Sequence, residues 1–381
     1  MKRVFFLGAG FSNLAGFPLG AELLHFVRQK LASSVELMDQ QVYLPILEQT
    51  IEIFKSSGRS FFANNLELLL TSFTLSLSYN DTEFIDKFKP IYETYISSGD
   101  KRYFFPQHVI GRITYGIRSA FRNHHILISG YGESPPIADQ EKAEIYNKFF
   151  NMLGSEDTII TLNYDILCEQ ALWNNDKWTF LDGYGFNKTK ESLMGSDNVG
   201  LYVKPEKSIV KIYKLHGSIN WAEDYEKNEG IILTDLLVFS KSFKGRNTED
   251  NKIGASEINR LILPNYSRSF IKQHAILEIW KAAKKSISEC DELYFIGYGL
   301  SDIDSSLQFL LYDSISSNIK LNKESIFVID NQSIEHTFAF SEKSVFLRYS
   351  RFLNDKCTFI KQSFKDWILG IRVVEQDALK K

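Results

Sequence analysis

The stretch VFFLGAGFSNLAGFP, residues 4–18, decides how the rest of the chain is interpreted. Its first four residues, Val4–Leu7, are continuously apolar, which predicts a short buried strand. Glycines then interrupt the apolar run, and the segment GAELLHFVRQKL, which begins at Gly20, has the pattern of a helix. A strand followed by a glycine-rich turn and a helix directs backbone N–H groups toward a point where a phosphate can bind.

Two other interpretations of this stretch stay open. Lys2 and Arg3 precede the apolar run, as in a secretory signal, but Asn13, Pro18 and the glycines break the hydrophobic segment that such a signal needs. An ordinary strand-to-helix turn fits as well, because GAGFS holds only two of the three glycines of a dinucleotide fingerprint. The turn alone therefore identifies no ligand.

Composition limits the class of protein. A chain of 381 residues is long enough for two domains, or for one domain enlarged by an insertion, and its net charge of −3 lacks the basic excess of a direct nucleic-acid binder. The three cysteines, at positions 168, 290 and 357, are too far apart for a zinc motif or a disulfide framework, which indicates a reducing, cytoplasmic setting. The apolar run from Leu68 to Asn80 is too short to span a membrane, so we expect no membrane association.

Strand and helix patterns alternate through most of the chain. Apolar, largely β-branched or aromatic runs predict strands at Val4–Leu7, Thr158–Leu162, Ile209–Leu215, Glu292–Ile296, Ser325–Ile329 and Cys357–Lys361. Helical patterns separate several of them, at Ile166–Trp173, Ala275–Ser288 and Ile303–Ser314. This alternation predicts an α/β fold with a Rossmann-like parallel sheet covered on both faces.

Residues 21–149 do not follow this alternation. Their patterns are mostly helical, as in LELLLTSFTLSL and HVIGRITYGIRSAF. We therefore expect a helical insertion subdomain over 21–149, and a sheet domain built from 1–20 and 150–381. Two polar stretches, Thr189–Asn198 and Lys241–Lys252, are expected to be surface loops.

Compact polar or glycine residues follow four of the predicted strands. They are Asn163 and Asp165 after the second strand, His216 after the third, Gly297, Gly299 and Ser301 after the fourth, and Asp330 and Asn331 after the fifth. In parallel sheets, ligands bind beyond the carboxyl ends of the strands. Together with the turn at residues 8–12, these positions predict a nucleotide site.

Each of these residues also has a purely structural interpretation. Asn163 and Asp165 are suited to cap the helix expected from Ile166, as Ser301 and Asp302 are for the helix expected from Ile303. His216 is one of seven histidines, and a single histidine is often a structural residue. Glu67, in NNLELLL, has the pattern of a solvated or capping carboxylate on a helix.

The segments GAGFS…AGFP, TLNYD, KLHGS, FIGYGL and VIDN, taken in this order, resemble the NAD-binding motifs of the sirtuin family. The resemblance is greatest to the bacterial sirtuin-like NAD-degrading proteins of anti-phage defence. It covers the first 20 residues and, discontinuously, about residues 155 to 335. TLNYD and KLHGS in this order form a specific pair, whereas the glycine-rich turn alone does not.

The resemblance implies roles for the same positions. Gly8, Ala9, Gly10 and Ser12, with Phe11 in the same turn, would bind the pyrophosphate of NAD+. Asn163 and Asp165 would contact the nicotinamide side, and His216 would be the catalytic histidine. Gly297, Gly299 and Ser301 would line the phosphate and adenosine side, with Asp330 or Asn331 near the adenosine ribose.

The chain also departs from the sirtuin pattern. Sirtuin deacylases carry two C-x-x-C pairs soon after the catalytic histidine, and the segment INWAEDYEKNEGIILTDLL here has no cysteine. Leu162 stands in place of the usual glutamine, and Leu19-Gly20-Ala21 in place of Asp-Phe-Arg. We therefore expect no zinc, and of the sirtuin site only the NAD-binding half.

The resemblance implies an NAD+ glycohydrolase that yields nicotinamide and ADP-ribose, and acts in anti-phage defence by depleting NAD+. His216 would serve as the general base, Asn163 would orient water or ribose, and Asp165 would stabilise the cation. A homo-oligomer working with a HerA-type hexameric ATPase is the expected assembly. Two alternatives stay open, a sirtuin-type ADP-ribosyltransferase or deacylase and a non-catalytic sensor of NAD or ADP-ribose.

Overall fold

A computed structural model describes residues 1–96, 106–129, 139–185, 207–224, 231–233, 257–261, 274–301, 304–331 and 344–370. Within these ranges no helix is both long enough and apolar enough to cross a membrane. The two expected surface loops, Thr189–Asn198 and Lys241–Lys252, lie outside them.

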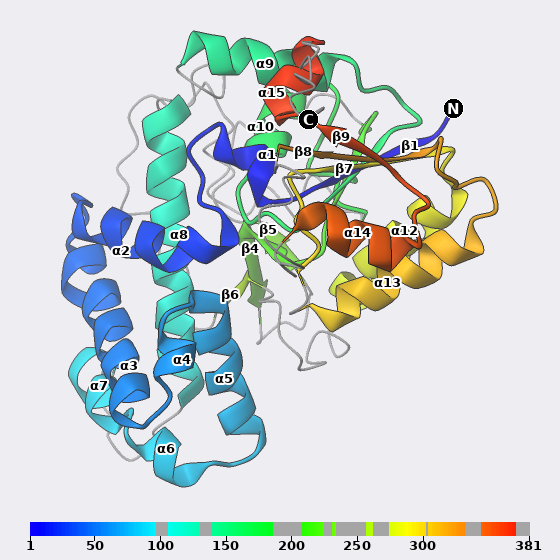
Figure 1. Cartoon of the computed structure of the whole chain (residues 1–381). Helices are drawn as coiled ribbons and strands as arrows, with labels where there is room; N and C mark the ends of the chain where they lie inside the picture. Colours follow the sequence, from blue (N-terminus) through cyan, green and yellow to red (C-terminus); the bar gives the residue numbers. More distant parts are fainter. Residues whose placement is uncertain are drawn as a thin grey trace, which may run out of the picture.

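A parallel sheet of six strands forms the centre of the molecule (Figure 1). Its strands run in the order β3-β2-β1-β7-β8-β9, and every neighbouring pair is parallel. The bounds are β1 (Arg3–Leu7), β2 (Thr158–Thr161), β3 (Lys211–Lys214), β7 (Glu292–Ile296), β8 (Ile326–Asp330) and β9 (Thr358–Lys361). The expected Rossmann-like α/β fold and its six strands are confirmed.

The position of β1 explains where a ligand can bind. Leu7, its last residue, pairs with Thr161 of β2 on one side and with Ile296 of β7 on the other. The chain order turns back at this point, because β2 and β3 extend the sheet in one direction and β7, β8 and β9 in the other. Such a switch leaves a crevice beyond the carboxyl ends of the central strands.

Helices cover both faces of the sheet (Figure 1). On one face lie α9 (Gln140–Asn151), α10 (Leu167–Asn174) and α15 (Phe364–Leu369), and on the other lie α12 (His274–Glu289), α13 (Ser305–Ser317) and α14 (Val345–Leu353). Alternate residues of a strand point to opposite faces. Accordingly, Phe5 of β1 meets Phe149 of α9 edge-on, with ring centroids 5.4 Å apart, whereas Phe295 of β7 packs on Tyr349 of α14 at 5.1 Å.

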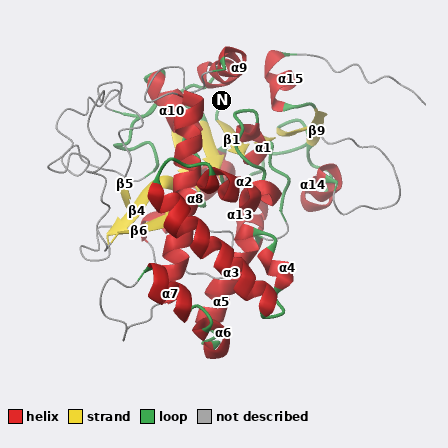
Figure 2. Ribbon diagram, turned by 90° about the vertical axis from the view of Figure 1, so that its left-hand side faces the viewer, coloured by secondary structure: helices red, strands yellow, loops and turns green. Residues whose placement is uncertain are grey.

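All secondary-structure elements that the structure describes between β1 and β2 are helices. They are α1 (Ala9–Asn13), the short helices η1 (Gly20–Glu22) and η2 (Asp39–Tyr43), α2 (Leu23–Ala32), α3 (Leu44–Ser56), α4 (Ser60–Ala63), α5 (Leu66–Ser78), α6 (Thr82–Asp86), α7 (Lys89–Tyr95), α8 (Pro106–Ser129) and α9. Figure 2 shows α3 to α7 gathered at the end of the molecule away from β1. The division of the chain at residues 20 and 150 stays a prediction.

Two details differ from the sequence analysis. The glycine-rich turn itself contains a helix, since α1 follows β1 after one residue, Gly8, and precedes the expected helix near Gly20. A second, antiparallel sheet was not expected. It consists of β4 (Gly217–Asp224), β5 (Ile231–Leu233) and β6 (Glu257–Leu261), and it packs against α8 (Figure 2).

Candidate functional site

A cavity of about 900 Å³ lies beyond the carboxyl ends of the central strands. Every candidate site residue except Phe11 lines it: Gly8, Ala9, Gly10, Ser12, Asn163, Asp165, His216, Gly297, Gly299, Ser301, Asp330 and Asn331. Residues from the ends of five strands, spread over more than 300 positions of the sequence, therefore share one space. A volume of this size is typical of a site for a small organic ligand.

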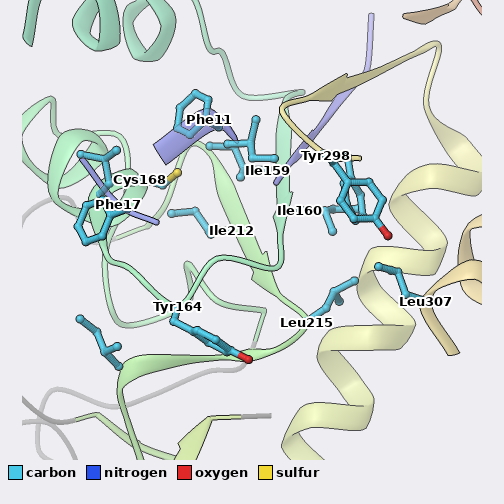
Figure 3. Packing of buried hydrophobic residues seen from close by; sticks show 14 of the residues in the cluster. Phe11, Phe17, Ile159, Ile160, Tyr164, Cys168, Ile212, Leu215, Tyr298 and Leu307 are labelled. Atoms are coloured by element: carbon cyan, nitrogen blue, oxygen red, sulfur yellow. The ribbon is translucent and has the colours of Figure 1, made fainter. Parts of the chain in front are cut away.

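Phe11 has a different place. Its side chain is fully buried and packs edge-on against Tyr146 and Phe149, with centroid separations of 5.3 and 5.2 Å. Its carbonyl accepts a hydrogen bond of 2.6 Å from the Tyr146 hydroxyl. Figure 3 shows Phe11 within the same buried cluster as Ile159 and Ile212. The Phe11 side chain thus anchors α1 in the core and does not reach the cavity.

The turns after β1 and β7 are in direct backbone contact. The Gly8 N–H donates to the Ile296 carbonyl at 3.0 Å, and the Gly10 N–H donates to the Gly297 carbonyl at 2.9 Å. A Cβ atom on Gly8 would lie only 2.5 Å from the Gly297 carbonyl oxygen. Gly297 also has a φ of +61°, which disfavours any other residue. Glycine is therefore required at both positions so that the two turns can form one wall of the cavity.

Asn163 joins the end of β2 to this wall. Its side-chain amide donates to the Gly8 carbonyl at 3.0 Å and to the Ser12 hydroxyl at 2.9 Å. Helix α10 is capped at Ile166 without a side-chain hydrogen bond, so the capping interpretation of Asn163 is wrong. Both side-chain N–H groups are used to hold the turn, which leaves the amide oxygen as the group that can accept from a ligand.

Asp165 is buried at the same strand end. Its Oδ1 accepts from the backbone N–H of Leu167 at 3.0 Å, so this carboxylate does support the first turn of α10. Burial raises the pKa of Asp165, and Lys214, the Leu167 N–H and Ser12 oppose that rise. Asp165 therefore already interacts with several groups of the protein itself.

A buried ion pair lies beneath Asp165. Lys214, the last residue of β3, forms a 3.0 Å ion pair with Glu169 of α10, and each side chain is only 1% exposed. The Lys214 ammonium also donates to the Asp165 carbonyl, and the Tyr184 hydroxyl donates to Glu169 at 3.0 Å. These contacts fix the chain just before His216 and just after Asn163.

His216 forms a dyad with an acid that the sequence analysis did not select. Its Nε2 lies 2.7 Å from Oδ2 of Asp304, and the two residues are only 5% and 6% exposed. The other carboxylate oxygen of Asp304 accepts from the Leu307 N–H at 2.9 Å and so caps α13. Asp304, rather than Ser301 or Asp302, is thus the capping residue, and Asp302 lies outside the described residues.

The charge on Asp304 decides which ring nitrogen of His216 donates a hydrogen bond. Burial would raise the pKa of Asp304, but the hydrogen bond and charge of His216, with the Leu307 N–H, outweigh burial and lower it. An ionised carboxylate only accepts hydrogen bonds, so Nε2 of His216 is the donor in this pair, and a neutral imidazole held in this way has its lone pair on Nδ1. Nδ1 forms no hydrogen bond with a described residue. His216 lines the cavity, and an unbonded ring nitrogen at such a place is the arrangement that a general base requires.

The adenosine side of the predicted site is formed by the ends of β7 and β8. Asp330 is the last residue of β8, and Asn331 follows it on the exposed rim. Ser301 is also exposed, and its backbone carbonyl accepts a hydrogen bond of 3.0 Å from the Gln308 side chain. Arg348 of α14, which the sequence analysis missed, lies close to Gly299, since its Nη2 would be 3.2 Å from a Cβ there.

Glu67 of α5 also lines this cavity and does not cap the helix. The cap of α5 is Asn65, whose Oδ1 accepts from the Leu68 N–H at 3.0 Å. No local pattern in the sequence places Glu67 here, because its position depends on how the helical segment packs against the sheet. The Asp304 cap, by contrast, had a local signal, an acidic residue just before a helical pattern.

No group of three or more His, Cys, Asp or Glu side chains in the described ranges is arranged to hold a metal ion. Residues 157–350 match the family model described as the SIR2-like domain. The match begins just before β2 and ends within α14, so it contains the Asn163, His216 and Asp304 positions but not the glycine-rich turn. No curated protein matches the chain.

Proposed function

Because the chain belongs to the SIR2-like domain family, whose members use NAD+, we propose that it is an NAD+ glycohydrolase. It would cleave NAD+ into nicotinamide and ADP-ribose. The observation that carries this proposal is the His216–Asp304 dyad, with its 2.7 Å hydrogen bond, in the wall of the cavity that the glycine-rich turn also lines.

The cavity supports NAD+ as the substrate. Its wall holds the Gly8–Ser12 turn after β1 and the Gly297–Gly299 turn after β7, which lie at the switch point of the sheet. A pyrophosphate is the group that such a turn and crevice suit. Asn163 is hydrogen-bonded to the same turn, so a dinucleotide with its phosphates there would have one ribose near Asn163 and His216.

The reaction needs a base but no acid. The bond between ribose C1′ and the nicotinamide nitrogen breaks, and its electron pair neutralises the cationic pyridinium ring. A water oxygen bonds to C1′, and His216 Nδ1 takes the proton that this water loses. The transition state resembles an oxocarbenium ion, as in glycoside hydrolysis. Asp304 stabilises the imidazolium that forms.

Hydrolysis fits this chain better than deacylation. The segment after His216, residues 219–237, has no cysteine for the paired C-x-x-C motifs that accompany an acyl-lysine cleft in sirtuin deacylases. Without a protein substrate bound beside the ribose, water is the nucleophile available. We propose that NAD+ depletion serves anti-phage defence, and that a homo-oligomer with a HerA-type ATPase restrains the enzyme.

Mass spectrometry of purified protein incubated with NAD+ tests the activity. Free ADP-ribose and nicotinamide in equal amounts support hydrolysis. ADP-ribosylated protein, or a deacylated test peptide, would instead indicate transfer or deacylation. Unchanged NAD+ together with measurable binding would indicate a sensor. Light scattering with and without the ATPase, followed by the same assay, tests the assembly.

A further inference from the structure

Glu67 enters the cavity from outside the sheet. It lies in the first turn of α5, a helix held in place by the Asn65 cap and by the buried side chains of Leu66, Leu69, Leu70 and Phe73. These apolar residues pack in the core, and Glu67, on the same helix, lines the cavity. The carboxylate is therefore positioned by packing rather than by chance exposure.

Glu67 is in electrostatic contact with the dyad. Burial raises its pKa most, the charge of His216 opposes that rise, and Asp304 adds to it. Tyr164 completes the group, since the charges of Glu67 and Asp304 both raise the pKa of its buried hydroxyl. The helical segment and the sheet thus bring two carboxyl groups and an imidazole to the wall of one cavity.

The carboxyl groups of Asp304, Asp165 and Glu67 differ in how many hydrogen bonds they form with the rest of the protein. Asp304 bonds His216 and the Leu307 N–H, and Asp165 bonds the Leu167 N–H above the cation Lys214. Within the described chain, no residue forms a hydrogen bond or an ion pair with the Glu67 carboxylate. A carboxylate that is partly desolvated and has no cation of its own interacts strongly with a positive charge placed beside it.

We propose that Glu67 is a further catalytic residue, whose carboxylate contacts the nicotinamide riboside part of NAD+ and stabilises the cation that forms as the C1′–N bond breaks. The inference rests on the proposed NAD+ hydrolysis. It moves the electrostatic role that the sequence suggested for Asp165 to a residue of the helical segment. It also gives that segment a function, because without α5 the cavity wall would lack the Glu67 carboxyl group.

The test compares Glu67→Gln with Glu83→Gln. Glu83 is a matched control, since it also lies in the first turn of a helix of the same segment, α6, but is exposed and outside the cavity. The glutamine variant of Glu67 keeps the shape and removes the charge. We expect kcat for NAD+ to fall roughly 10²-fold, the effect of losing one preorganised electrostatic contact. Thermal stability and ADP-ribose affinity, measured by calorimetry, should stay unchanged, because ADP-ribose lacks the cationic ring.

Glu67→Asp separates charge from shape. It keeps the carboxylate one methylene shorter, and we expect it to recover part of the lost kcat. Wild-type turnover in Glu67→Gln would overturn the role of Glu67 while leaving NAD+ hydrolysis intact. Equal loss in Glu67→Gln and Glu67→Asp, accompanied by weaker ADP-ribose binding, would also overturn it, in favour of a structural role. A wild-type protein that leaves NAD+ intact would overturn the proposed function, and this inference with it.

Discussion

His216 and Asp304 lie 88 residues apart in the sequence, and their side chains meet at 2.7 Å. His216 follows β3, an edge strand on one side of β1. Asp304 caps the helix that follows β7, on the other side of β1. Because Asp304 also caps α13, the orientation of the histidine is tied to a rigid helix. The dyad therefore spans the switch point at which the two halves of the sheet meet.

Asp304→Asn should lower NAD+ turnover by roughly 10²- to 10⁴-fold, because an amide does not hold the imidazole in one tautomer or stabilise its charged form. Stability should change little, since Asn caps a helix about as well as Asp. Turnover and melting temperature measured on the same preparation check this prediction. A folded variant with parental turnover would exclude Asp304 from the mechanism.

His216→Ala and Asn163→Ala should each lower turnover by roughly 10²- to 10⁴-fold, through loss of the base and through misplacement of ribose or water. If they act as one unit, the double variant should be little worse than either single variant. Asn163→Ala should also cost about 1 kcal/mol of stability for each of its two hydrogen bonds to the turn. Fully additive losses of activity would show instead that the residues act independently.

The sheet could be predicted because its strands carry their own signal. Runs such as VFFL and TIIT are apolar and short, and each is followed by glycine or polar residues, so the order of elements and the strand ends were visible in the sequence. The strand ends in turn predicted which residues share the cavity. The sequence did not show which way Phe11 faces, because neighbouring residues of a turn need not face the same way: Ser12 lines the cavity, and the Phe11 side chain is in the core.

The features that the sequence did not predict depend on contacts between segments far apart in the chain. Glu67 reaches the cavity only because α5 packs within the helical segment, and nothing in NNLELLL encodes that contact. The three strands of the small sheet are short and follow no clear alternation. The start of α13 was expected two residues early, so the acid chosen as its cap was Asp302 instead of Asp304, and the partner of His216 was missed.

Gly8→Ala should destabilise the protein by about 1–3 kcal/mol, because the added Cβ would meet backbone atoms of the next turn at 2.5 and 2.6 Å. Backbone atoms cannot rotate away as the end of a side chain can, so NAD+ affinity should fall as well. Gly20→Ala is the matched control, since nothing lies within 4 Å of a Cβ there. Equal melting temperatures and NAD+ affinities for the two variants would contradict the close contact of the turns after β1 and β7.

Lys214→Met should be strongly destabilising, by about 3–5 kcal/mol, because it leaves the Glu169 carboxylate buried without its cation. Changing both partners, in Lys214→Met with Glu169→Leu, should recover part of this loss, since the Glu169 carboxylate is then gone, while the buried Asp165 carboxyl group still lacks the cation that opposes the rise of its pKa. Urea denaturation of the three proteins measures the difference. If the double variant were as unstable as the single one, the ion pair would owe its importance to its hydrogen bonds with Asp165 and Tyr184.

Two buried histidines should make the fold sensitive to acid. Burial lowers the pKa of His124 to about 4, against the effect of its hydrogen bond to the Ala15 carbonyl, and burial lowers the pKa of His125 well below 6.5. The Ile166 N–H donates to His125 Nε2 at 3.0 Å, and a protonated ring cannot accept that bond. Both rings must therefore stay neutral in the folded protein.

The direction of the pH effect follows from these pKa values. An unfolded histidine takes up a proton near pH 6.5, whereas the folded protein does not until the pH approaches 4 at His124, so acid favours the unfolded state across this interval. The stability that the neutral, buried histidine contributes is fully present above pH 6.5 and is lost as the pH falls toward 4. Between pH 7 and pH 5 we expect a loss on the order of 1–2 kcal/mol from His124, measured by urea denaturation, and a further loss in the same direction from His125. His124→Gln should flatten this dependence, whereas His25→Gln, at an exposed position, should keep the slope of the parent. Identical slopes for all three proteins would mean that His124 is protonated in the folded state as readily as in the unfolded one.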